Sequence, residues 1–102
     1  KTIISVRVAD AITAEIKSLQ IAFGDLTARE FEHNVNHVIG LLTRYPNLGI
    51  KVGGHRRLVQ VNRQVGLIYS VNSEELKISK VLFYEQITRY VGQDVLDQAK
   101  RQ

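Results

Sequence analysis

The pattern of apolar residues in this chain changes at Pro46, its only proline. Before Pro46, apolar residues recur at the spacing of amphipathic helices. Beyond it and the glycine pair Gly53–Gly54, they fall into β-rich runs separated by short polar joins. Proline lacks an amide hydrogen and clashes with the preceding helical turn, so it marks the end of the helical part. Helices and strands in separate stretches predict an α+β fold.

The chain opens with a predicted strand that leads into a first helix. The strand "KTIISVRVAD" alternates so that one face carries Ile4, Val6 and Val8. Asp10 is the expected N-cap of the helix, and Gly24 is its expected end. The apolar stripe of this helix is Ile12, Ile16, Leu19 and Phe23. The first helix is therefore predicted to be amphipathic.

The sequence "LTAREF" predicts the start of a second helix. Thr27 and Glu30 have the spacing of a capping box, and Leu26 and Phe31 flank them as a hydrophobic staple. The apolar stripe of this helix is Phe31, Val35, Val38, Leu42 and Tyr45. Only "GDL" joins the two helices. A joint this short predicts a helical hairpin.

Three β-rich runs follow, "HRRLVQV", "VGLIYSV" and "ELKISKVLFY". Their short joins predict an antiparallel meander, in which Leu76, Ile78 and Leu82 share one face. The segment Thr88–Gln102 is expected to hold a short helix, with residues 91–102 as a frayed tail. The predicted order is β-α-α-β-β-β in a single domain over 1–102.

Positive charge is concentrated in the middle of the chain. Lysine and arginine number 14 against 10 acidic residues, for a net charge of +4 and a pI near 9.6. No aspartate or glutamate occurs from His33 to Ser73. The cations in that stretch are Arg44, Lys51, Arg56, Arg57 and Arg63. Such segregation raises the local potential and predicts an anionic partner, either nucleic acid or an acidic protein.

Composition excludes some classes of protein. Without cysteine, the chain has neither disulfides nor thiolate metal sites. No apolar run reaches the ~20 residues that cross a bilayer, and no signal-peptide pattern opens the sequence. We therefore expect a cytoplasmic domain with no cofactor and no membrane partner.

Three short motifs follow one another along the chain: "YPNLG" at Tyr45–Gly49, "RRLVQV" at Arg56–Val61 and "VGLIYSVNSEELKISKVL" at Val65–Leu82. The first resembles the aromatic-Pro-x-x-Gly that closes the second helix in ParE-type toxins. The second resembles the Arg-Leu strand of that family, and the third its Leu-Ile-Tyr-x-Val hairpin. Together they make the stretch from Ile3 to Tyr84 similar to the RelE/ParE superfamily, the plasmid-stabilisation toxins of type II toxin–antitoxin pairs.

The resemblance implies a toxin that poisons an essential process and is neutralised by an antitoxin that wraps its surface. RelE-type members cut mRNA on the ribosome, whereas ParE-type members block DNA gyrase without a known chemical step. The implied partners are a cognate antitoxin and either gyrase or the ribosome with its mRNA. A homodimer or a toxin–antitoxin hetero-oligomer is implied as the assembly. A non-toxic binding homologue remains a further alternative.

The residues that RNA cleavage needs are incomplete in this sequence. Cleavage without a metal needs a base, cations that hold the phosphate, and an acid for the leaving oxygen. By resemblance, the candidates for a ribonuclease are Arg57, Arg63 and Tyr84. However, Gly66 stands where ribonuclease members generally carry an arginine, and Glu85 places a carboxylate where those members are basic. The sequence therefore favours the ParE-like interpretation, with no catalytic residue assigned.

The cations are more naturally candidates for binding an anionic partner. The residues in question are Arg56, Arg57, Arg63, Lys80 and Arg89. Arg56 and Arg57 point to opposite sides of a regular strand, so one is expected to pair with the hairpin or the antitoxin while the other faces solvent. A salt bridge to Glu30 or Glu32 is the alternative use of either arginine.

Other polar and apolar residues have simple structural interpretations. His33 and His37 lie four apart on one helix, which suits a metal, but a solvated helix face explains them and no metal site is predicted. Tyr69 follows the strand alternation and is expected in the core. Ile21 and Leu41 fall outside the apolar stripes. They either fill the core or provide the exposed apolar surface that an antitoxin would grip.

Overall fold

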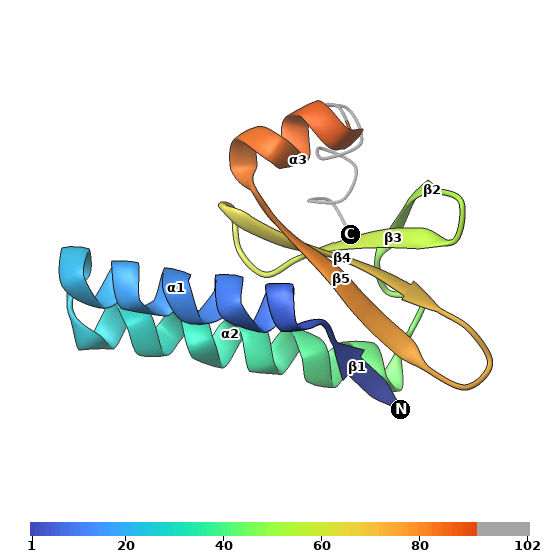
Figure 1. Ribbon diagram of the computed structural model, residues 1–102, viewed down its shortest axis with the longest axis horizontal. Helices are drawn as coiled ribbons and strands as arrows, with labels where there is room; N and C mark the ends of the chain where they lie inside the picture. The colour runs from blue at the N-terminus through green and yellow to red at the C-terminus, as the bar shows by residue number, and fades with distance from the viewer. Residues whose placement is uncertain (92–102) are drawn as a thin grey trace.

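The computed structural model describes residues 1–91 and places them in an α+β fold (Figure 1). In chain order, the elements are β1 (Thr2–Ile4), α1 (Val6–Phe23), α2 (Asp25–Arg44), β2 (Ile50–Gly53), β3 (Arg56–Gln60), β4 (Val65–Val71), β5 (Leu76–Phe83) and α3 (Tyr84–Val91). The predicted order of strand, helical hairpin and antiparallel strands is confirmed. None of the described helices is long and apolar enough to span a bilayer.

The strands form one sheet in the order β1-β5-β4-β3-β2. Strands β2 to β5 are antiparallel neighbours, and β1 joins the far edge by pairing parallel to β5. Strand β4 lies in the middle, and its residues 65–69 are all buried. An unbroken apolar run of this kind is expected of a strand that is covered on both faces.

The two faces of the sheet are covered by different helices (Figure 1). The hairpin of α1 and α2 packs on one face, where Leu42, Tyr69 and Ile78 are fully buried. Helix α3 packs on the other face, where Ile87 lies against Ile68 and its neighbours. The molecule therefore has three layers, with the sheet between the hairpin and α3.

The first helix starts earlier than its sequence predicts. Ser5, rather than Asp10, is the N-cap, because its Oγ accepts a hydrogen bond from the Val8 amide at 3.2 Å. The predicted strand is therefore wrong beyond Ile4. Val8, which fits the alternation of a strand, also continues the helical stripe, and it is buried in the core. Val6 faces solvent instead.

The second helix also starts earlier than predicted. Gly24, with φ of 95°, ends α1 and immediately precedes Asp25, the first residue of α2. Glycine adopts this left-handed φ without steric cost, so one residue is enough to join the helices. Thr27 and Glu30 therefore lie inside α2, and the predicted capping box is wrong.

Both apolar stripes end sooner than predicted. Phe23 is 71% exposed and Tyr45 is 59% exposed. Figure 1 shows that the closed end of the hairpin extends beyond the sheet, so Phe23 has no layer to pack against. Tyr45 is the C-cap residue, where the chain leaves the helix. Ile21 is exposed, which agrees with the alternative that it provides exposed apolar surface. Leu41 is half-buried.

The sheet contains one strand that the pattern does not predict. Strand β2 comprises only "IKVG", which lies between the loop after α2 and the turn at Gly53–Gly54. It pairs with β3 through Ile50 opposite Leu58 and Lys51 opposite Arg57. Four residues are too few for an alternation to stand out from a loop.

The register between β4 and β5 shifts by one residue at Ser79. Such a bulge moves every later side chain to the other face. Leu82 therefore packs with Ile68 under α3, while Leu76 and Ile78 face the hairpin. The prediction that these three β5 residues share a face is wrong at Leu82.

The C-terminal helix begins at Tyr84, before the segment in which it was predicted. The predicted final strand accordingly ends one residue earlier, at Phe83. Residues 92–102, which make up nearly all of the predicted frayed tail, lie outside the described residues.

Candidate functional site

Tyr69 fastens the loop that follows α2 to the sheet. Its Oη accepts a hydrogen bond from the Gly49 amide and donates one to the Pro46 carbonyl, each at 2.8 Å. The tyrosine is fully buried, out of reach of water. Its hydroxyl nevertheless has a partner both as a donor and as an acceptor. The "YPNLG" motif therefore has a structural explanation in this chain.

Arg57 fastens the same loop from the neighbouring strand. It pairs with Tyr69 across β3 and β4, so the two side chains lie on one face. Its Nη1 donates to the Gly49 carbonyl at 2.6 Å and to the Asn47 carbonyl at 3.2 Å. Within the described chain, Arg57 therefore bonds to these two carbonyls. The predicted alternative was a salt bridge to Glu30 or Glu32.

Burial raises the pKa of the Tyr69 phenol above its ordinary value of 10.0, although the Gly49 amide and the Arg57 guanidinium act in the opposite direction. A folded pKa above the unfolded one means that the unfolded chain loses this proton first. The stability that the protonated Tyr69 phenol contributes is therefore complete below about pH 10, and it falls as pH rises through the pKa of the folded state.

Tyr69→Phe removes the hydroxyl and is expected to lower the free energy of unfolding by about 1–3 kcal/mol near neutral pH. The gap between wild type and variant should narrow above about pH 10, because only wild type carries the titrating phenol at this position. Urea unfolding followed by circular dichroism across alkaline pH measures both values. A gap that widens with pH would contradict the pKa direction.

A basic pocket lies beside this loop, at the turn between β2 and β3. It measures about 210 Å³ and is lined by Asn47, Lys51, Gly54, His55, Arg56, Arg57 and Val71. Gly53 and Gly54 have φ of 136° and 57°, which allows the turn that brings both strands to the pocket. The guanidinium of Arg57 has donors beyond Nη1, so holding the loop leaves it able to donate to a ligand. Cations and amide donors around one opening suit a carboxylate or a phosphate.

Two residues of this pocket, Arg56 and Arg57, were predicted to bind an anionic partner. Lys51 and His55 were not predicted as site residues. The signal that could have identified them is their position on either side of Gly53–Gly54, where a tight turn brings the flanking side chains together.

The three candidates for a ribonuclease are not brought together. Arg63 is exposed in the turn that Asn62 stabilises by accepting hydrogen bonds from two following amides. Arg57 lies near the start of β3, whereas Arg63 lies in the turn beyond the end of that strand. Tyr84 follows Phe83 at the same end as Arg63, away from Arg57. No single concave place therefore holds this trio.

The remaining predicted cations are also dispersed. Lys80 is exposed on β5 and pairs with Ile68, on the face that α3 covers. Arg89 is exposed in the last turn of α3. Anion binding by these two residues stays a prediction.

Gly66 explains why the sheet cannot carry a phosphate-binding arginine at this place. A Cβ added there would lie 2.9 Å from Leu58 Cδ1 and 3.1 Å from Ile87 Cδ1. Ile87 belongs to α3 and is fully buried. The space that a side chain at Gly66 would need is therefore filled by the packing of α3 on β4.

His33 and His37 stack on α2, with ring centroids 6.4 Å apart and an interplanar angle of 11°. Within residues 1–91, no group of three or more histidine, cysteine, aspartate or glutamate side chains is placed to hold a metal ion.

No protein-family model matches the sequence, and no curated protein matches it. Function is therefore inferred from the fold, the loop contacts and the distribution of charge.

Proposed function

We propose that this chain is the toxin of a type II toxin–antitoxin pair and that it is ParE-like in action. It binds and inhibits a protein target such as DNA gyrase in the cytoplasm, and a cognate antitoxin neutralises it. The α+β order of elements and the three motifs support the superfamily.

The observation that carries the ParE-like choice is the dispersal of the cleavage candidates. Arg57 hydrogen-bonds the carbonyls of the Asn47–Gly49 loop, while Arg63 and Tyr84 lie at the other end of the sheet. Cleavage of RNA needs its base, cations and acid around one phosphate. Dispersed side chains instead suit a toxin that acts by occupying a surface of its target.

The basic pocket supports an acidic antitoxin segment as the neutralising partner. The pocket falls in the part of the chain that has no aspartate or glutamate, so no neighbouring carboxylate in sequence opposes an incoming acidic side chain. Complementary charge of this kind mainly speeds association and selects the partner.

Titration of the purified chain into a gyrase supercoiling assay tests the proposal. Supercoiling of relaxed plasmid is expected to stop as the chain approaches the concentration of gyrase, and the heat-unfolded chain serves as control. In cells, induced expression should arrest growth, and co-expression of the cognate antitoxin should restore it. Full supercoiling at excess chain would overturn the proposal.

A further inference from the structure

Two cations of the basic pocket lie directly opposite each other on neighbouring strands. Lys51 of β2 pairs with Arg57 of β3, so both side chains are on the same face of the sheet. Opposite residues of an antiparallel pair have Cβ atoms about 4.5–5.5 Å apart, and like charges at this separation destabilise the pair. Neither residue forms an ion pair with a carboxylate within residues 1–91. The described chain therefore leaves this repulsion without a counter-charge.

Arg57 is already held in place for a ligand. Its Nη1 donates to the carbonyls of Asn47 and Gly49, and because the guanidinium is planar, these two bonds fix the direction of its other N–H groups. Arg57 is half-buried, whereas the paired Lys51 is exposed. A fixed guanidinium beside an ammonium suits a carboxylate, whose two oxygens can accept from both groups. A donor that is already ordered loses little entropy when a ligand binds.

The surroundings of the basic pocket do not cancel its charge. None of the acidic residues among residues 1–91 lines the pocket. Glu74 and Glu75, at the same end of the sheet, line a different pocket together with Lys1. Lys1 and Lys77 lie at that end as well and balance these two carboxylates. The other acidic residues of the described chain are on the helices. The pocket therefore keeps a positive field.

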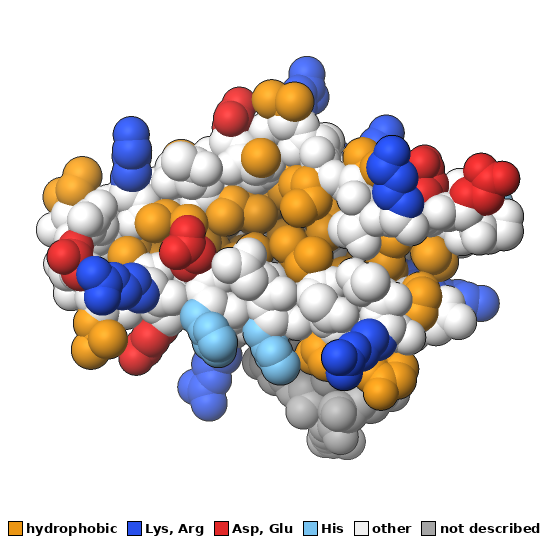
Figure 2. All heavy atoms as spheres, turned by 90° about the horizontal axis from the view of Figure 1, so that it is seen from below, with side chains coloured by type: hydrophobic (Ala, Val, Ile, Leu, Met, Phe, Trp, Pro, Cys, Tyr) orange, Lys and Arg blue, Asp and Glu red, His pale blue; other side chains and the backbone are white. Residues whose placement is uncertain are grey.

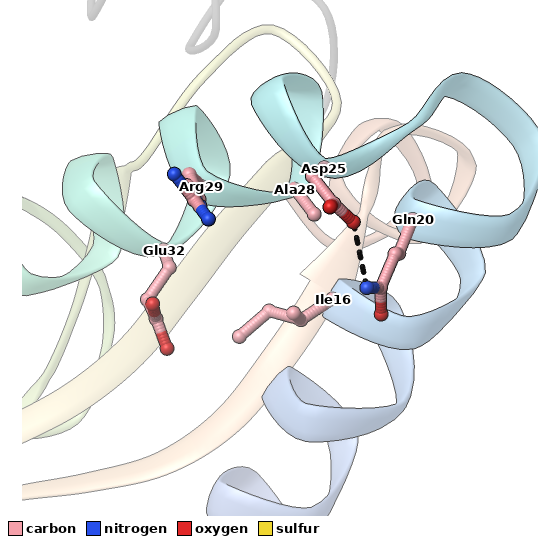
Figure 3. Close-up of a pocket in the computed structure, with 6 residues that line it drawn as sticks. All are labelled: Ile16, Gln20, Asp25, Ala28, Arg29 and Glu32. Carbon is pink, nitrogen blue, oxygen red and sulfur yellow. Dashed lines mark hydrogen bonds between the residues drawn. The ribbon is translucent and has the colours of Figure 1, made fainter.

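Two other parts of the described surface carry charges of both signs. The groove between α1 and α2 is lined by Asp25, Arg29 and Glu32 (Figure 3). Asp25 accepts a hydrogen bond there from Gln20 at 2.7 Å. Figure 2 shows the face seen from below, where acidic and basic side chains are also interspersed. The basic pocket differs from both surfaces, because all of its charged side chains are basic.

We propose that Lys51 and Arg57 form a carboxylate site that takes one aspartate or glutamate side chain from the acidic segment of the antitoxin. This inference rests on the proposed function and names the groups that recognise the neutralising partner. The carboxylate lies between the ammonium and the remaining N–H groups of the guanidinium, so it replaces a repulsion with two attractive contacts. Because it binds the folded chain, it also stabilises the pairing of β2 with β3.

A nucleic acid fits this site less well than a protein segment does. Nucleic acids are held by several cations at successive phosphates. Here Arg63 lies in the turn beyond β3, and Arg89 lies in the last turn of α3. Arg44 lines another pocket, on α2. A single pocket with two opposed cations instead suits one anionic group presented by a protein surface.

Replacing Lys51 by glutamate tests the site, because the new carboxylate stands where the carboxylate of the ligand is proposed to lie. Lys51→Glu turns a like-charge pair into an opposite-charge pair, so the melting temperature at low salt is expected to rise by about 2–5 °C. Lys77→Glu is the matched control, since it makes the same charge change on an exposed strand residue that pairs with the uncharged Ser70. We expect no rise in this control. A melting temperature of Lys51→Glu equal to that of wild type would overturn the inference.

Binding is measured by nuclear magnetic resonance titration of the full chain with a blocked hexaglutamate peptide at neutral pH, with hexaglutamine as the uncharged control. The amide shifts of wild type are expected to concentrate at residues 51–57. The dissociation constant should rise at least about tenfold in Lys51→Glu and less than about threefold in Lys77→Glu. Equal weakening by the two substitutions would show that only net charge matters and would contradict the site. A thymidylate hexamer that bound this pocket as tightly as hexaglutamate would assign it to nucleic acid instead.

The outcomes separate this inference from the proposed function, because the peptide titration does not involve gyrase. If wild type inhibits gyrase but hexaglutamate does not bind at the pocket, the carboxylate site is wrong and the proposed function stands. If hexaglutamate binds at the pocket and wild type leaves supercoiling untouched, the proposed function is wrong. The assignment of the site to an antitoxin is then wrong with it.

Discussion

Replacement of Gly66 by arginine is expected to lower the free energy of unfolding by about 3 kcal/mol or more. Gly66 is buried in the central strand, and an added Cβ would already press on Leu58 and Ile87. An arginine must either bury its charge beneath α3 without a partner or push that helix off the sheet. Urea unfolding of the wild type and the variant, followed by circular dichroism, measures the loss.

The same substitution at Gly40 is the control. A Cβ at Gly40 would meet nothing within 4 Å, and arginine is a better helix former than glycine. Gly40→Arg should therefore be as stable as wild type or slightly more stable. If Gly66→Arg matched it, α3 would not pack over β4, and the position would be open to a phosphate-binding arginine.

Gly49→Ala is expected to cost about 2–3 kcal/mol, the second largest effect. The new methyl group would lie 2.7 Å from the Leu58 carbonyl oxygen and 2.8 Å from both Cε1 and Oη of Tyr69. The strand backbone cannot yield easily. The buried ring could move only by breaking its hydrogen bonds to the loop. Thermal and urea unfolding should both report the loss.

Gly40→Ala makes the same chemical change with the opposite expected sign. Its methyl group meets open space inside a helix, where alanine is favoured over glycine by about 1 kcal/mol. Equal effects at Gly49 and Gly40 would mean that the loop after α2 does not lie against Tyr69 as described.

The order of elements was predictable because its signals are long or local. Two amphipathic stripes, a proline at the end of the second and three β-rich runs define the layers. Exact helix starts were not predictable from the pattern alone. Both Ser5 and Asp10 have cap chemistry, and only the packing of Val8 against the sheet decides between them.

The details of the sheet were harder to predict for a different reason. The bulge at Ser79 changes which face Leu82 occupies, and no single residue type marks a bulge. Strand β2 is too short to show a period of two, and it is defined by pairing with a strand that comes later in the chain.

The role of Arg57 shows what sequence could not provide about the site. Its charge and its resemblance to a family position suggested an anion or a phosphate, whereas its hydrogen bonds go to the loop carbonyls of Asn47 and Gly49. Those contacts depend on the loop folding back over β3. Composition and spacing contain no information about that approach.

Primer extension on mRNA translated in the presence of the purified chain tests most directly whether the protein binds rather than cleaves. We predict no new stops in the transcript at concentrations of chain that abolish gyrase supercoiling in the same preparation. New stops that disappear in Arg57→Ala and Tyr84→Phe variants would contradict the account, since residues placed at opposite ends of the sheet would then serve one reaction.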